Sequence, residues 1–272
     1  MMWRVIVCSL VLFVGLLAFA VVPASAQGLI WSLPEDGTWV RYEGTYTQVE
    51  TRPDSIEGDL QIEWTRWITI NSVGQEMAEF NDETVPCRWI EIKVETGKAS
   101  ETGVDAGPIG ARIVKVLVPE SRVIGKQVDE DQIPVAFLPI VKGYRKIGDS
   151  PTEEIKAKVL QIYPTVSMLM HYPTVESTGE QEDPDVRLGP VTATMLKSSY
   201  KMESLYSRTV NEATLWRSDE VPFGLAKWSV VLVREAKDSS KPRDEFRQVS
   251  EVTEEMSAHL TGNDAQSELA TP

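Results

Sequence analysis

Cysteine and histidine are almost missing from this chain, which has two of each in 272 residues. Cys8 lies in the N-terminal apolar run, so the rest of the chain has only Cys87 and cannot form an internal disulfide. Zinc sites need Cys and His side chains at short spacings, and no such set occurs. We predict no metal site and interpret Cys87 as a small apolar core residue at a strand start. The alternative for Cys87 is an intermolecular disulfide in an oxidising compartment.

Motifs for nucleotide binding and acyl transfer are absent as well. The chain contains no GxGxxG, no GxxxxGK[ST] and no GxSxG sequence. Positive charge is also scarce, with 27 Lys and Arg against 41 Asp and Glu and a net charge of -14. Phosphate backbones are bound by clustered Lys and Arg, so this balance excludes a general nucleic-acid binder. We therefore predict no cofactor, no nucleic-acid partner and no enzymatic activity.

The excess of acidic residues leaves two alternatives open. Two carboxylates that face each other across a cleft would make an acid-based hydrolase, for example on sugars. Four acidic residues lie in one loop and offer hard oxygen ligands for calcium, although their spacing does not match an EF-hand. They are Glu180, Glu182, Asp183 and Asp185. A solvated surface loop explains the same residues, and it is the interpretation that we prefer.

The first 26 residues have the parts of a signal peptide. One positive charge, at Arg4, precedes the uncharged apolar run Val5–Val22, and Ala24–Ala26 supplies the small-x-small pattern of a cleavage site. We predict cleavage after Ala26 and a periplasmic or secreted protein with no transmembrane span after cleavage. The alternative is an uncleaved N-terminal helix that anchors the protein.

Alternation of apolar and polar residues dominates the remaining sequence. In Leu60–Val73 the even positions are mostly apolar and the odd positions mostly polar, which predicts a long, half-buried strand. Val249–Leu260 suits either a strand or a helix, and we favour a strand that pairs with Leu225–Arg234. The other predicted strands are Thr38–Glu50, Arg88–Thr96, Arg112–Val118, Val191–Leu196, Tyr200–Tyr206, Thr209–Trp216 and Leu225–Arg234.

Helical signals are confined to the middle of the chain. Ser150–Glu153 matches a capping box with proline at the first helical position, which predicts a helix over Pro151–Ile162. Ala136–Lys146 is a second candidate helix, weakened by Pro139, and Glu176–Pro190 reads as a long surface loop. The fold class is therefore mainly β (α+β): a curved antiparallel sheet or open half-barrel with a few short helices. We assign residues 27–261 to a single β-rich domain and 262–272 to a flexible tail.

Tryptophan is the informative excess, because most tryptophans fall inside predicted strands. Trp64 lies on the apolar face of its strand, whereas Trp67 and Trp89 lie on faces that are otherwise polar. Such residues suit an aromatic-lined pocket for an apolar ligand, or a stacking surface for sugar. The alternative is that they are core residues and cross-strand pairs. The candidate ligand-binding residues are Trp64, Trp67, Trp89, Trp216, Trp228 and Phe223.

A turn and the order of elements carry a resemblance to a known family. Val221–Gly224 combines a proline with a glycine and predicts a corner that aims the following strand. A signal peptide, long antiparallel strands, a helical insertion in mid-chain and this corner resemble the exported half-barrels of the LolA/LppX lipoprotein-carrier type. The closing stretch Val252–Leu269 resembles the ends of uncharacterised bacterial exported proteins. The resemblance implies an open curved sheet that holds lipid or another apolar ligand, and it assigns no ligand residue by position.

The sequence leads to one preferred function and one main alternative. The preferred function is a non-enzymatic exported protein whose concave sheet binds or carries an apolar small molecule or lipid. The alternative is a structural or interaction protein of the cell envelope that binds another envelope protein and no small ligand. An acid-based hydrolase ranks behind both.

Overall fold

The structure, a computed structural model, describes residues 28–101, 103–123, 137–170, 172 and 175–270. The predicted signal peptide and its cleavage site lie outside the described residues. The strands are β1 (Trp39–Glu50), β2 (Leu60–Phe80), β3 (Glu83–Ser100), β4 (Gly103–Asp105), β5 (Arg112–Pro119), β6 (Phe137–Pro139), β7 (Lys142–Ile147), β8 (Glu153–Glu154), β9 (Val159–Gln161), β10 (Val175–Glu182), β11 (Ala193–Glu203), β12 (Ser207–Arg217), β13 (Leu225–Ala236) and β14 (Arg247–Gly262).

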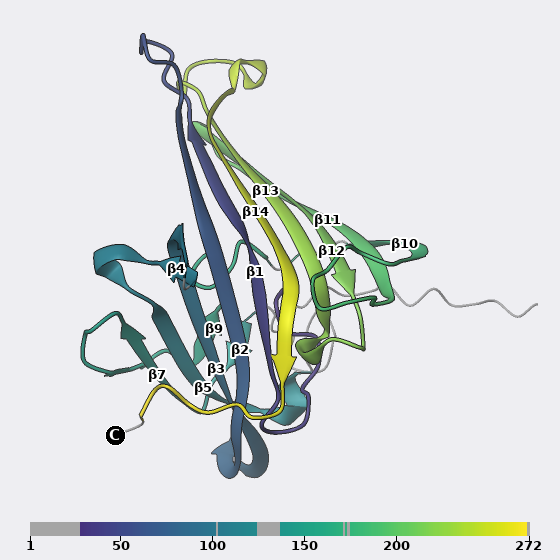
Figure 1. Cartoon of the computed structure of the whole chain (residues 1–272). Coiled ribbons are helices and arrows are strands. Elements are labelled where there is room, and N and C mark those ends of the chain that lie inside the picture. The colour runs from purple at the N-terminus through teal and green to yellow at the C-terminus, as the bar shows by residue number, and fades with distance from the viewer. Residues whose placement is uncertain (1–27, 102, 124–136, 171, 173–174, 271–272) are drawn as a thin grey trace, which may run out of the picture.

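One large antiparallel sheet runs through the protein. Its strand order is β10-β11-β12-β13-β14-β1-β2-β3-β5-β7-β8, with β4 beside β3, and β6 and β9 form a separate two-stranded sheet. The end strands β10 and β8 do not pair, so among the described residues the sheet is open and not closed into a barrel (Figure 1). The prediction of a mainly β protein with a large, open antiparallel sheet is confirmed.

The alternation read from the sequence sets the two faces of the sheet. Ile68 and Ile70 of β2 are fully buried, whereas Trp67 and Thr69 between them keep part of their surface exposed. Successive side chains of a strand point to opposite faces, so one face is apolar and covered. We call the face that carries Ile68 the inner face and the face that carries Trp67 the outer face.

Two irregular segments cover the lower part of the inner face. The first segment begins at residue 28, ahead of β1, and its Leu29 and Ile30 are buried. The second segment contains β6 and β9, and its Leu160 and Leu169 are buried. These side chains join the inner-face residues of the central strands in one hydrophobic cluster. Removal of this apolar surface from water is the main favourable contribution to the fold.

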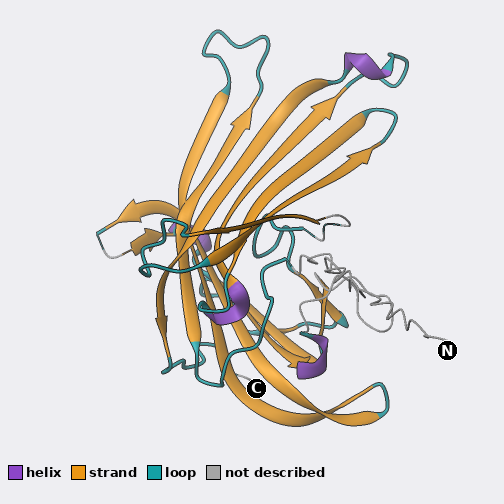
Figure 2. Ribbon diagram, turned by 90° about the vertical axis from the view of Figure 1, so that its right-hand side faces the viewer, coloured by secondary structure: helices purple, strands orange, loops and turns teal. Residues whose placement is uncertain are grey.

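Three hairpins extend the sheet beyond this covered part. They are formed by β1 with β2, β11 with β12, and β13 with β14, each of which pairs antiparallel. Figure 2 shows the far ends of these hairpins projecting as a single layer beyond the rest of the molecule. β2 pairs with β3 only from Thr65 onward and β11 with β10 only as far as Ser198, so in the described residues the projecting layer has a free edge on each side.

The predicted helices are wrong. The segment Pro151–Ile162 forms β8 and β9, and Ala136–Lys146 contributes β6 and part of β7 in its described residues. Leu160 and Ile162 are buried on either side of exposed Gln161, which is a strand period, and an isolated short helix has little stability to oppose such pairing. The described residues contain only short 3₁₀ turns: η1 (Gly107–Ile109), η2 (Glu120–Arg122), η3 (Pro222–Gly224) and η4 (Arg243–Glu245).

Two further expectations concern the ends of the sheet. Glu176–Pro190, predicted as a surface loop, is in its first half the edge strand β10, and polar side chains suit such an edge. Val249–Leu260, predicted as a strand that pairs with Leu225–Arg234, lies in β14 and pairs antiparallel with β13. Within the described part of the chain, no helix has the length and apolar character needed to cross a membrane.

The segment assigned to a tail lies against the outer face of β3 and β5. The buried carboxylate of Glu91 accepts hydrogen bonds from the Ser267 hydroxyl at 2.6 Å and from the backbone N–H of Glu268 at 2.9 Å. The ammonium group of Lys115 donates to Ser267 at 2.9 Å, and Leu269 is buried. These contacts hold residues 267–269 on the sheet.

Candidate functional site

The six aromatic residues singled out by the sequence do not line one cavity, because the sheet divides them between its faces. The register places Trp64 and Trp228 on the inner face and Trp67, Trp89 and Trp216 on the outer face. The sixth, Phe223, lies in the corner before β13 and is fully buried. A ligand held on one face therefore meets only part of this set.

Phe223 has a structural role in that corner, as the turn prediction for Val221–Gly224 implies. It adopts a positive φ of 65°, and its carbonyl accepts a hydrogen bond from the Trp31 backbone N–H at 2.8 Å. Gly224 follows with a φ of 87°, and a Cβ there would lie 2.7 Å from the Trp31 Cβ. The corner thus ties the N-terminal covering segment to the start of β13.

The tryptophans on the outer face form hydrogen bonds or a cation–π contact with neighbouring polar side chains. The indole N–H of Trp89 donates to Glu76 at 3.1 Å, and that of Trp216 donates to Glu182 at 2.8 Å. The guanidinium carbon of Arg41 lies 4.3 Å from the centre of the Trp67 ring, a cation–π contact. These rings form cross-strand contacts, which agrees with the alternative reading of the tryptophans.

A buried polar network occupies the centre of the inner face. Arg66 on β2 and Glu254 on β14 form an ion pair at 2.6 Å, and both side chains are almost completely removed from solvent. Glu254 also accepts the indole N–H of Trp228 at 2.9 Å, and the Trp228 ring packs edge-on against Tyr42 with 4.8 Å between ring centres. Buried charges need such partners, because desolvation otherwise opposes their ionised forms.

The same network holds a segment that we call the strap, defined as residues 166–170 with Tyr172. Arg66 donates to the Val166 carbonyl at 2.8 Å, and the Met168 backbone N–H donates to Glu254 at 3.0 Å. Asn211 on β12 donates to the Met168 carbonyl at 3.2 Å and accepts the Tyr172 hydroxyl at 2.7 Å. The strap therefore lies directly across the inner faces of the central strands.

Next to this network, the inner face continues onto the projecting hairpin of β1 and β2 as a half-buried apolar strip. We call it the inner strip and define it as Tyr46, Leu60, Ile62 and Trp64. Tyr46 lies directly opposite Trp64 in the register, and burial raises the pKa of its phenol, while the charge of Arg66 acts in the other direction. The outer face of the same stretch carries exposed Gln61 and Glu63, so only the inner face is apolar there.

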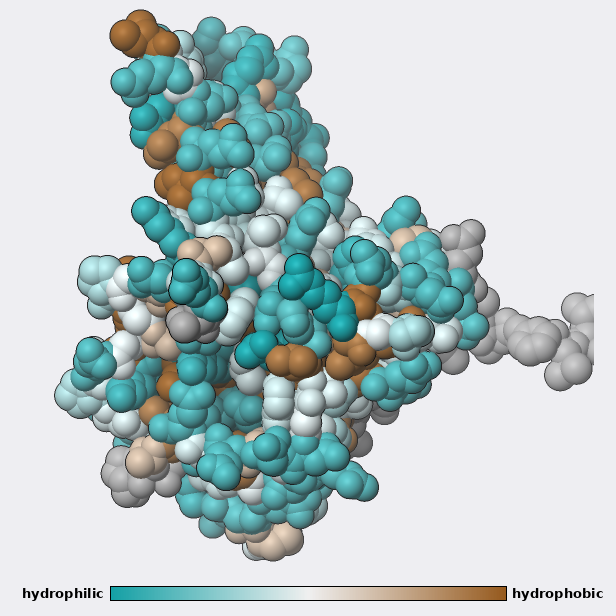
Figure 3. Space-filling model, viewed as in Figure 1, coloured by the Kyte–Doolittle hydropathy of each residue, from teal (hydrophilic) through white to brown (hydrophobic). Residues whose placement is uncertain are grey.

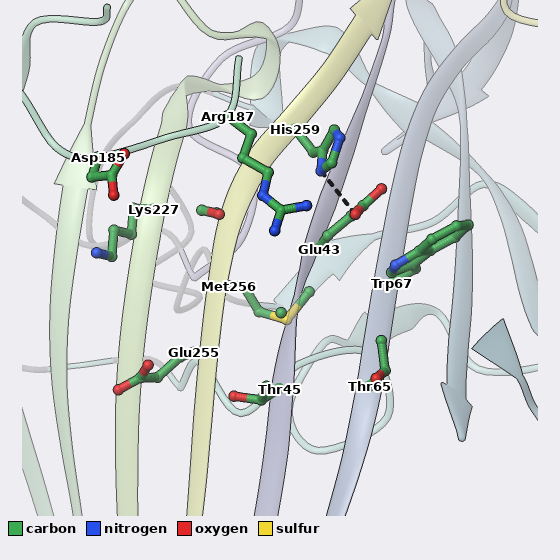
Figure 4. Close-up of a pocket in the computed structure, with 12 residues that line it drawn as sticks. Glu43, Thr45, Thr65, Trp67, Asp185, Arg187, Lys227, Glu255, Met256 and His259 are labelled. Atoms are coloured by element: carbon green, nitrogen blue, oxygen red, sulfur yellow. Dashed lines mark ion pairs between the residues drawn. The ribbon is translucent and has the colours of Figure 1, made fainter. Parts of the chain in front are cut away.

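A polar depression of about 410 Å³ lies on the outer face, which we call the outer depression. Figure 4 shows His259 and Glu43 pointing toward each other, with Arg187 beside them. The His259 Nδ1 and Glu43 Oε2 atoms are 2.8 Å apart, and Arg41 forms an ion pair with Glu43 at 2.8 Å. The outer depression is lined by Glu43, Gly44, Thr45, Thr65, Trp67, Asp185, Arg187, Lys227, Glu255, Met256, Ser257 and His259.

The chemistry of the outer depression suits weak binding of a polar molecule. Its lining carries both signs of charge, with Glu43, Asp185 and Glu255 as acids and Arg187 and Lys227 as bases. The Glu43 carboxylate lies beside the Arg41 guanidinium and the His259 ring. Of the described residues, no three metal-ligating side chains come together, in this depression or elsewhere.

The residues at the centre of the inner face are not among the candidates predicted from the sequence. Arg66 occupies an apolar-face position of the alternating Leu60–Val73 segment, and Glu254 does the same between Val252 and Met256. A charged residue in an apolar register is a visible signal of a buried, paired charge. The partners were not visible, because nothing local shows which strands become neighbours.

Comparisons with known proteins add no relatives. A comparison with protein-family models and a search of curated proteins each find no match to this chain. The resemblance to LolA/LppX-type carriers therefore stays a prediction, and the functional argument depends on the geometry alone.

Proposed function

We propose that this protein is a non-enzymatic exported protein that binds an apolar or lipidic ligand against the inner face of its open sheet. The observation that carries the proposal is the inner strip. Leu60, Ile62 and Trp64 place three large apolar side chains on one face of β2, all of them only half-buried. Apolar surface that is left partly exposed gains roughly 25 cal/mol for each Å² that a ligand covers.

The position of the inner strip supports the same proposal. It joins the covered hydrophobic core at Tyr46, which packs against the core cluster, and it ends at the free edge of β2. A long apolar molecule can therefore approach from the open side of the sheet and lie along the strip, without unfolding the covered part. The predicted N-terminal signal peptide extends the proposal to a periplasmic or secreted location, with cleavage after Ala26.

The experiment expresses the full chain with its own N-terminal segment in a bacterial host and purifies the exported product gently. Native mass spectrometry followed by organic extraction then tests for a bound apolar molecule, and an apolar fluorophore tests the emptied protein. We expect co-purified lipid or fluorophore uptake, reduced in Trp64→Ala and unchanged in the outer-face control Trp216→Ala. A protein that carries no lipid and takes up no fluorophore contradicts the proposal, as does equal uptake by both variants and the wild type.

A second candidate function is protein–protein interaction in the cell envelope, and the ends of the projecting hairpins favour it. Ile56 between β1 and β2 is fully exposed, and Leu205 and Tyr206 between β11 and β12 are 74% and 64% exposed. Figure 3 shows hydrophobic surface at the far end of the projecting strands. Contact surfaces are marked by contiguous apolar patches, and Leu205 and Tyr206 are adjacent exposed apolar side chains of the kind that such a patch contains. Cross-linking in cells that is lost in Ile56→Ser together with Leu205→Ser would support this function over ligand carriage.

A further inference from the structure

Three hydrogen-bond donors on the inner face have no partner among the described residues. The Nε atom of Arg66 and the hydroxyl oxygen of Thr96 are buried without a hydrogen bond. The side chain of Arg112 is half-buried, and it forms no ion pair or hydrogen bond with a side chain that the structure describes, although the Arg112 backbone is part of the β-ladder. A buried donor without an acceptor costs roughly 1–3 kcal/mol, so the two buried atoms, next to the half-buried Arg112, need a physical reason.

The register of the sheet brings these three residues together. Arg66 on β2 lies directly opposite Thr96 on β3, which places their Cβ atoms about 5 Å apart. Arg112 on β5 lies opposite Val94, two residues from Thr96 on the same strand and the same face. The three side chains therefore form a diagonal row across β2, β3 and β5.

Only one of the two positive charges in this row is neutralised within the described part of the protein. Glu254 is the carboxylate that pairs with Arg66, and its oxygens already accept hydrogen bonds from Arg66, Trp228 and the Met168 backbone. Burial, and the like charge of Arg66, lower the pKa of Arg112. A chain with a net charge of -14 thus keeps two neighbouring arginines with Glu254 as the single carboxylate paired with either of them among the described residues.

The row also adjoins the inner strip. Arg66 follows Trp64 by two residues on the same face of β2, a separation of roughly 7 Å along the strand. Its guanidinium carbon lies 5.4 Å from the centre of the Tyr46 ring. A molecule with an apolar chain on the strip therefore has its end beside the unpaired donors.

We propose that Arg66, Thr96 and Arg112 bind the anionic head group, a carboxylate or a phosphate, of an amphiphilic ligand whose apolar chain lies on the inner strip. The inference rests on the proposed function for the apolar chain and adds the chemistry of the head group. Guanidinium groups favour carboxylates and phosphates, because their planar N–H donors match two anion oxygens at once. The Thr96 hydroxyl supplies a further donor to the same anion.

The experiment measures the affinity of the full-length exported protein, after delipidation, for four probes by isothermal titration calorimetry. Dodecyl phosphate and dodecanoate carry the two anionic head groups, dodecanol carries the same chain with a neutral head, and inorganic phosphate has no chain. The wild type is expected to bind one or both anionic amphiphiles at least about tenfold more tightly than dodecanol. The stronger of the two identifies phosphate or carboxylate as the head group.

Two variants and one control locate the site. Arg112→Gln and Thr96→Val are expected to weaken binding of the anionic amphiphiles by about tenfold or more and to leave dodecanol binding unchanged. The control Arg52→Gln changes the net charge by the same amount as Arg112→Gln, but at the far tip of the β1–β2 hairpin. It is expected to leave the affinities for the anionic amphiphiles and for dodecanol unchanged. Circular dichroism checks that each variant is folded, and Thr96→Val serves if Arg112→Gln does not fold.

Each alternative outcome has a distinct meaning. Equal affinity for dodecanol and the anionic amphiphiles overturns the head-group site but leaves the apolar proposal standing. Binding of inorganic phosphate that is lost in Arg112→Gln, with no gain from the chain, supports the anion site and contradicts the apolar function. Failure of all four probes to bind overturns both.

Discussion

Arg66 and Glu254 reach each other across the central strand β1, and the 2.6 Å contact between them joins strands that are 188 residues apart in the sequence. Gly44 of β1 lies opposite Arg66 in the register, so no side chain of β1 stands at that position. The pair holds the strap through the Val166 carbonyl and the Met168 N–H. One ion pair therefore links β2, β14 and the segment that covers them.

Replacement of Glu254 by glutamine is expected to destabilise the protein strongly. The amide keeps the size of the side chain but leaves the buried charge of Arg66 without a counter-ion, which costs roughly 3–5 kcal/mol. Urea denaturation of Glu254→Gln measures the loss. The control is Glu255→Gln on the exposed outer face of the same strand, which should stay within about 0.5 kcal/mol of the wild type. Equal stability of the two variants would show that the ion pair contributes little.

Gly224 and Gly58 give a matched pair for the corner before β13. Both have a positive φ, of 87° and 76°, but a Cβ at Gly224 would contact Trp31 whereas Gly58 has open space around it. Gly58→Ala is expected to cost about 1–2 kcal/mol from backbone strain alone. Gly224→Ala adds about 1–3 kcal/mol of overpacking. Thermal and urea denaturation of both variants test this order, which the reverse result would refute.

Tyr42 is expected to make stability fall at alkaline pH. Burial raises the pKa of its phenol above the ordinary value of 10.0, and the hydroxyl donates to the Leu225 carbonyl at 3.0 Å. The contribution of Tyr42 is fully present below pH about 10 and is lost as the pH rises further, because the unfolded chain then ionises while the folded one does not.

The variant Tyr42→Phe isolates this effect. It should be less stable than the wild type at pH about 8, because the Leu225 carbonyl loses its donor, and the difference should shrink toward pH about 11. Urea denaturation across that range is the measurement. A difference that stays constant with pH would mean that Tyr42 does not contribute to the alkaline loss.

Glu91 is expected to hold residues 267–269 against the sheet and to protect them from proteolysis. Glu91→Gln removes the negative charge that accepts two backbone N–H groups and the Ser267 hydroxyl, and hydrogen bonds to a charged group are worth about 1.5–3 kcal/mol each. Limited proteolysis followed by mass spectrometry should show faster loss of the last residues than in the wild type. The control Glu83→Gln lies at the exposed start of the same strand, away from residues 267–269, and should not change the rate. Equal rates in all three proteins would indicate that the segment is released without these bonds.

The strands were predictable because their information is local. In Leu60–Val73 the alternation places Ile68 and Ile70 on one face and Trp67 on the other, as the structure has them. The order of strands was not predictable in the same way. β1 has β14 as a neighbour, and no residue in either strand identifies its partner by itself.

The predicted helix over Pro151–Ile162 failed for a related reason. Its capping box is a local signal, but Ile155 donates its backbone N–H to the Gly143 carbonyl at 2.7 Å and so continues the pairing with β7. Val159, which a helical reading places on the buried face, is 38% exposed. Tertiary pairing decided the conformation of a segment whose own preference is weak.

The candidate site was predictable only in part. Trp64 lies in the inner strip, but the tryptophans on the outer face are separated from it by the thickness of the sheet. The arginines and Thr96 were overlooked, because a single strand shows neither that a residue is buried nor that it lacks a partner. Their signal appears only when three strands are placed side by side.

The pairing of β1 with β14 has a consequence for how the molecule is built. The middle of the sheet is formed by the first and the last long strands of the chain, so a nascent chain that stops before residue 247 presents two half-sheets, each with an uncovered edge. Contacts between such distant segments form late and slowly. The sheet therefore becomes continuous only when its final strand arrives, and until then both edges are open to incorrect partners.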